Sequence, residues 1–159
     1  MSPPIEIIFS LFSVSVLIVI FFIDLNQGII PFKVILPTIL ITVVFFLFKD
    51  QSTFLTHMLS GIAVSLFFFL LFAATRGKGM GFGDVVYALF LGLLLGFPNS
   101  IIGLYIAFLT GAVISLILVL LKRKKLRGST IPFGPFLVLG TFIAYIWGDL
   151  ITGFIFKLL

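Results

Sequence analysis

The sequence predicts an all-α integral membrane protein with about six transmembrane helices. Of its 159 residues, 62% are hydrophobic and only 9% are charged, which is too little polar surface for a water-soluble fold. The apolar stretches also lack the alternating pattern of outer-membrane barrel strands. Helices are favoured because in lipid they satisfy their backbone hydrogen bonds internally.

Six apolar segments follow one another, separated by short polar or glycine-containing breaks. The first is interpreted as a mature helix because it lacks the basic leading segment and small-residue cleavage site of a signal peptide. The fourth is short, and about 13 residues at 1.5 Å each reach only about 20 Å into a hydrocarbon core about 30 Å thick. The expected segments are Ile5 to Ile23, Val34 to Phe48, Met58 to Ala74, Val85 to Phe97, Ile101 to Leu121, and Ile131 to Trp147 or beyond.

Residues 1–159 are predicted to form a single membrane-embedded domain, since nearly every residue belongs to an apolar segment or a short connection. The chain has no cysteine, so disulfides and thiolate metal sites are excluded. His57 is the only histidine and is interpreted as structural, so neither a metal nor a cofactor is expected. Nucleic-acid binding is not expected despite the net charge of +5, because the bases lie in short loops that meet anionic lipid.

The distribution of basic residues predicts the orientation in the membrane. Lys49 and Lys157 lie on one side, and eight bases lie in the loops after the first, third and fifth segments. Those eight are Lys33, Arg76, Lys78, Lys122, Arg123, Lys124, Lys125 and Arg127. Because cytoplasmic loops are rich in Lys and Arg, these loops are expected in the cytoplasm of a cell inner (cytoplasmic) membrane, with both termini outside.

Asp24 and Asp84 are the candidate functional residues. Asp24 closes the first apolar segment and Asp84 opens the fourth, so the alternation of segments places both at the cytoplasmic face. Each alone has a simple structural explanation, Asp84 as a helix N-cap and Asp24 as a solvated residue where a helix ends. Together they suit aspartic proteolysis, in which one carboxyl polarises the substrate carbonyl while the other takes a proton from water.

The loop from Gly77 to Gly83 places a glycine at every second position before Asp84. It lacks the Walker pattern of a phosphate-binding loop. Glycine also permits close backbone approach, which both helix packing and an extended peptide substrate require.

Three segments together resemble the type IV prepilin leader peptidases, which are membrane aspartyl proteases of the GxGD type. They are Asp24-Leu25 with Ile30-Pro31, the run from Gly79 to Val85, and the run from Ile131 to Leu137. The resemblance implies six helices, catalytic roles for Asp24 and Asp84, no catalytic metal, and cleavage of leaders from type IV prepilin-like precursors in pilus assembly or protein secretion. It implies supporting roles for Pro31, Lys78, Gly81, Gly83, Pro132, Phe133, Gly134 and Pro135.

The chain departs from the family pattern in three ways. Val86-Tyr87 stands where the family commonly has Lys-Leu, so the role of that lysine is lost or taken over by Lys78. Phe32 follows Ile30-Pro31 where Asn or Asp is common. The larger bacterial members carry an N-terminal domain with a cysteine cluster and N-methylate the new pilin terminus. Neither that domain nor any cysteine is present here, so the sequence indicates the short catalytic core and gives no support for N-methylation.

Two other classes of function remain open beside a membrane aspartic endopeptidase. An ion- or proton-coupled carrier would bind a cation between Asp24 and Asp84, but would be expected to have polar residues along several segments. A catalytically inactive membrane scaffold is compatible with Val86-Tyr87. The expected partners are prepilin-like proteins and membrane lipid, and the sequence carries no signal for an oligomeric state.

Overall fold

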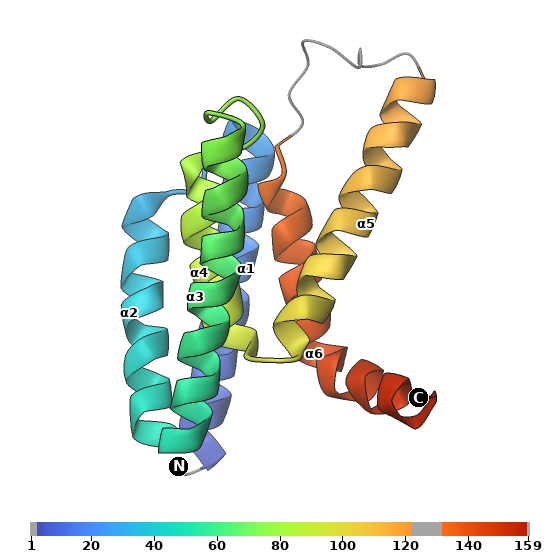
Figure 1. Cartoon of the computed structure of the whole chain (residues 1–159). Coiled ribbons are helices and arrows are strands. Elements are labelled where there is room, and N and C mark those ends of the chain that lie inside the picture. Colours follow the sequence, from blue (N-terminus) through green and yellow to red (C-terminus); the bar gives the residue numbers. More distant parts are fainter. Residues whose placement is uncertain (1–2, 122–131, 159) are drawn as a thin grey trace.

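The computed structural model describes residues 3–121 and 132–158, which form six α-helices and no strand within those ranges (Figure 1). Five of the helices are long and apolar enough to cross a membrane, and α4, with 14 residues, is shorter. The predicted all-α integral membrane fold with six helices is therefore confirmed. The helices are α1 (Pro3–Gln27), α2 (Phe32–Lys49), α3 (Gln51–Ala74), α4 (Phe82–Leu95), α5 (Asn99–Leu120) and α6 (Gly134–Leu158).

The observed helices extend beyond the apolar segments at several ends. The largest difference at a helix start is in α3, which begins at Gln51 and not at Met58. It begins there because the Asp50 side chain accepts a hydrogen bond from the Thr53 amide (3.2 Å) and caps the helix. The polar turn that Asp50 caps thus belongs to α3, although the sequence predicts a break between two helices there.

The helices alternate in direction, so every second connection lies at the same end of the bundle. Figure 1 shows the end of α1, the loop between α3 and α4, the end of α5 and the start of α6 together at one end. The turn between α2 and α3 and the turn between α4 and α5 lie at the opposite end. Asp24 near the end of α1 and Asp84 at the start of α4 therefore share an end, called here the aspartate end, and the other is called the far end.

Helix α4 runs through the middle of the bundle. Ten of its 14 residues are buried, and it packs most extensively against α3 and also against α2, α5 and α6. The Tyr87 hydroxyl donates a hydrogen bond to Thr141 Oγ1 (3.0 Å), which ties α4 to α6. Because other helices surround it, α4 does not need to present a full membrane-spanning length to lipid.

The backbones of α3 and α4 approach each other at Gly61 and Gly92. A methyl group added to Gly92 would lie 2.6 Å from both the Gly61 Cα and the Ser60 carbonyl oxygen. Helices α5 and α6 meet in a similar way, since a methyl group on Gly140 would overlap the Gly103 carbonyl oxygen. Small residues that let backbones approach are the usual means of packing helices in lipid. Away from these contacts α5 leans outward towards the aspartate end (Figure 1).

We expect Gly92→Ala to destabilise the protein by about 1–3 kcal/mol, because the added methyl group has no room between α3 and α4. The matched control is Gly153→Ala, since Gly153 lies in α6 with no atom within 4 Å of its added methyl group. That change should leave stability unaltered or slightly raised, as alanine favours helix more than glycine does. Thermal unfolding in one detergent measures both, and equal melting temperatures for the two variants would contradict the packing.

Candidate active site

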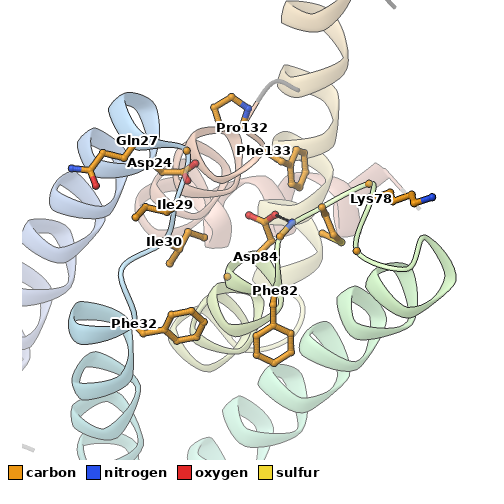
Figure 2. Close-up of a pocket in the computed structure, with 16 residues that line it drawn as sticks. Asp24, Gln27, Ile29, Ile30, Phe32, Lys78, Phe82, Asp84, Pro132 and Phe133 are labelled. Carbon is orange, nitrogen blue, oxygen red and sulfur yellow. Dashed lines mark hydrogen bonds between the residues drawn. The ribbon is translucent and has the colours of Figure 1, made fainter. Parts of the chain in front are cut away.

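A cavity of about 640 Å³ lies at the aspartate end, and three separate chain segments line it (Figure 2). The first comprises Asp24 and the turn that follows α1, the second is the glycine loop up to Asp84, and the third is Pro132 with Phe133. These are the same three segments that carry the family resemblance in the sequence. The fold thus brings together residues that are more than a hundred positions apart.

Asp24 lies in the last turn of α1 and is only 3% exposed. Its Oδ2 atom is buried and has no hydrogen-bond partner among the described residues. Gly134 packs directly against it, since an added methyl group would overlap Oδ2 and lie 2.7 Å from Cγ. A buried polar atom without a partner requires an explanation, and Asp24 lines the cavity.

Asp84 is the third residue of α4 and is 8% exposed. Its Oδ2 accepts a hydrogen bond from the Gly81 amide (3.1 Å), and its own amide donates to the Gly81 carbonyl (3.2 Å). The sequence reading placed Asp84 immediately before the helix, and this was wrong by three positions because α4 begins at Phe82 with Gly81 as its N-cap. The bond to Gly81 holds one oxygen of the carboxyl in place.

The two carboxyl groups face the same cavity (Figure 2). They come from opposite helix ends, Asp24 from the end of α1 and Asp84 from the start of α4. Among the described residues, no three His, Asp or Glu side chains gather as a metal site would require, and the acidic side chains of the cavity lining are Asp24 and Asp84.

The two glycines that flank Phe82 differ in how much room surrounds them. A methyl group on Gly83 would lie 3.1 Å from the Cβ of Ile30, which is buried beside the cavity. A methyl group on Gly81 would meet nothing closer than Asp84 Oδ2 at 3.8 Å. Close packing against Ile30 therefore explains why position 83 holds a glycine. Gly81 has room for a methyl group, so packing does not explain the glycine there.

Aromatic side chains lie along one side of the cavity. Phe32 and Phe82 stack with ring centroids 6.4 Å apart, and Phe72 meets Phe82 edge-on at 5.6 Å. The sequence shows Phe32 as a departure from the family pattern but does not predict that it stacks on Phe82. Three other lining residues are not predicted from the sequence, although they lie shortly after Asp24 in the chain or in the glycine loop. These are Gln27, Ile29 and Met80.

The other predicted supporting residues lie in different places. Lys78 is exposed on the cavity rim, and its side chain extends away from both carboxyls (Figure 2). Pro31 is not among the lining residues; it starts α2, where its carbonyl accepts hydrogen bonds from the next turn. Pro135 is buried in the first turn of α6, where proline is tolerated because its amide would have no helical partner.

Pro132 and Phe133 lie on the cavity wall, and Phe133 contacts Phe108 of α5 at 5.1 Å between ring centroids. The pair that replaces Lys-Leu lies outside the cavity lining, with Val86 half-buried and Tyr87 fully buried in the core. The basic run 122–127 and Ile131 lie outside the described residues.

Fold and site together define an all-α integral membrane protein with two buried carboxyl groups around a cavity at one end of its helix bundle. The Type IV leader peptidase family matches residues 11–116, a range that includes both aspartates. The chain belongs to this family, which confirms the resemblance seen in the three segments.

Individual relatives agree with this assignment, and each bears the name prepilin leader peptidase/N-methyltransferase. The protein from Legionella pneumophila is 34% identical over 152 residues, covering 91% of this chain and 52% of the relative. For the protein from Aeromonas salmonicida the identity is 33% over 141 residues, covering 86% and 48%. The Pseudomonas aeruginosa protein is 31% identical over 134 residues, covering 82% and 46%.

The chain spans about half the length of these relatives. No solved structure matches it.

We expect Gly134→Ala to destabilise the protein by about 1–3 kcal/mol, because its methyl group would displace the Asp24 carboxyl. In the Asp24→Ala background the same change should cost much less, since the carboxyl that it strikes is gone. The interaction term of this double-mutant cycle, measured by thermal unfolding, reports the contact directly. Gly81→Ala is the control, because Gly81 has room for a methyl group. Strictly additive effects of the changes at Asp24 and Gly134 on stability would contradict the contact between them.

Proposed function

We propose that this chain is a membrane aspartic endopeptidase that removes leader peptides from type IV prepilin-like precursors. The observation that carries the proposal is the convergence of three distant segments on one cavity that contains both Asp24 and Asp84. A structural role for each aspartate alone would not require the two carboxyls to share a cavity. The name that the relatives bear, prepilin leader peptidase/N-methyltransferase, supports the peptidase activity and the class of substrate.

Asp24 and Asp84 are the proposed catalytic residues. Two neighbouring carboxyl groups do not readily ionise together, so one keeps a proton while the other is charged. The charged carboxyl takes a proton from a water held between them, and the water oxygen attacks the peptide carbonyl carbon. The protonated carboxyl gives its proton to the carbonyl oxygen, and a tetrahedral diol forms.

Breakdown of the diol completes the reaction. The carboxyl that now holds the proton gives it to the leaving nitrogen as the C–N bond breaks, and the other carboxyl takes a proton from a diol hydroxyl. The leader leaves with a new carboxyl end and the remainder with a new amine. One proton stays on the pair, which is thereby ready for the next water. In this scheme the Gly81 amide holds Asp84 in place, and Gly134 provides the room that Asp24 needs.

The surroundings of the cavity suit the chemistry of such a substrate, a basic leader followed by an apolar helix. Apolar side chains on the wall, including Ile29, Phe32 and Phe133, offer contacts to the apolar part. The loop from Gly77 to Gly83 presents backbone with little side-chain bulk, which an extended peptide can approach closely.

We further propose that the aspartate end faces the cytoplasm of a cell inner membrane. Lys33, Arg76 and Lys78 lie at this end of the described structure, and cytoplasmic loops are the ones rich in Lys and Arg. A leader that is still attached to a newly made precursor would meet the cavity from that side.

We expect Asp24→Asn and Asp84→Asn each to reduce cleavage of a prepilin-like peptide by at least about a hundredfold, because an amide keeps the shape but cannot exchange the proton. The measurement is turnover by the purified protein in detergent, with thermal unfolding to show that each variant is folded. If the two residues act as one unit, the double variant is no slower than either single variant. Cleavage should also persist in the presence of a chelator.

The matched control is Asp50→Asn, which removes a carboxylate at the far end where an asparagine can still cap α3. It should cleave at the wild-type rate. Substantial turnover in either Asp24→Asn or Asp84→Asn would rule out the two-aspartate mechanism. Ion transport without cleavage by the wild-type protein would instead identify a carrier, and neither activity would identify a scaffold.

A further inference from the structure

A second cavity of about 280 Å³ lies at the far end of the bundle, and all six helices contribute to its lining. It has no part in the proposed peptidase site, since none of its residues lines the aspartate cavity. Two of the chain's five acidic residues lie here, as many as in the aspartate cavity, and the fifth is the cap residue Asp50. The lining also includes Lys49 and the only histidine, His57.

The charges in the far-end cavity do not balance. Lys49 Nζ lies 3.3 Å from Glu6 Oε1, which is the only ion pair among the described residues. Asp149 instead accepts a hydrogen bond from the Asn99 side-chain amide (2.7 Å), which is neutral. With His57 counted as neutral, the lining carries one more negative charge than positive. The cavity is therefore suited to a ligand that brings a cationic group to Asp149.

The position of these residues along their helices gives the depth of the cavity in the membrane. Glu6 lies in the first turn of α1, Lys49 ends α2, and Asn99 begins α5. Each of these helices is a candidate membrane span, so the cavity lies where the hydrocarbon core gives way to the head groups. Trp147, half-exposed on α6, fits this level, because tryptophan favours the membrane interface.

Strongly exposed apolar residues adjoin two of the cavity's charged residues in the sequence. Phe48 precedes Lys49 and is 73% exposed, and Leu150 follows Asp149 and is 72% exposed. A ligand that reaches the charged groups along this surface would have an apolar part in contact with such side chains. This combination of an ionic end and an apolar body is that of a phospholipid.

We propose that the far-end cavity binds the head group of phosphatidylethanolamine. The primary ammonium group donates to Asp149, which has no cationic partner among the described residues, while the phosphate lies beside Lys49. Phosphatidylglycerol brings no cation to Asp149. Phosphatidylcholine has a cation without N–H donors, so it cannot make the same hydrogen bonds.

The test is thermal unfolding of the full chain in a neutral detergent, with the three phospholipids added at equal mole fraction. Phosphatidylethanolamine should raise the melting temperature by an amount on the order of a few degrees beyond the other two, because a ligand that binds only the folded state stabilises it. Asp149→Asn should lose this increment, since it removes the charge but keeps an acceptor for Asn99. Asp50→Asn, at the same end but outside the cavity, should keep it.

Native mass spectrometry provides a second measurement for any variant that is too unstable to melt cleanly. Phosphatidylethanolamine should remain bound in preference to phosphatidylglycerol, and both Asp149→Asn and Glu6→Gln should weaken that preference. Equal increments for the three lipids, or an undiminished increment in Asp149→Asn, would overturn the proposal. So would an increment from soluble glycerophosphoethanolamine that the lipid fails to reproduce, because the site would then bind a small molecule from solution.

Discussion

The close packing of α4 against α3 is the constraint on which the rest of the structure depends. Gly61 and Gly92 let the two backbones meet, and other helices cover α4 on its remaining sides. A helix enclosed in this way can be short, and its first turn can lie below the level where the neighbouring helices end. Asp84 is thereby placed at the aspartate end, in the same cavity as Asp24 at the end of α1.

The cost of burying the two carboxyls explains why their surroundings are so specific. A charged or polar group buried in an apolar setting is unfavourable unless it is hydrogen-bonded, yet the structure satisfies Asp84 only in part and leaves Asp24 Oδ2 without a partner among the described residues. Stability alone would favour apolar residues at both positions. The fold keeps room for the Asp24 carboxyl instead, because Gly134 lies where a larger residue would overlap it. Such an arrangement is expected where bound water and substrate complete the hydrogen bonds.

Much of this arrangement follows from the sequence, because six alternating apolar segments place Asp24 and Asp84 at one end by parity alone. The short fourth segment was also predictable, since its length is counted directly. Hydrophobic periodicity does not predict contacts between distant segments. Two such contacts are Gly134 against Asp24 and the stack of Phe32 on Phe82. These depend on how the helices pack, which hydropathy does not encode. The start of α3 was misplaced for a different reason, because a capped polar turn extends the helix beyond its apolar part.

The central claim is that Asp24 and Asp84 act on one water molecule. It is tested most directly by an experimental structure of the chain with a peptide-like inhibitor whose hydroxyl replaces that water. The account predicts one hydroxyl or water oxygen within about 2.6–3.2 Å of a carboxyl oxygen from each aspartate. A structure in which the two carboxyls bind separate partners, with protein atoms between them, would contradict it.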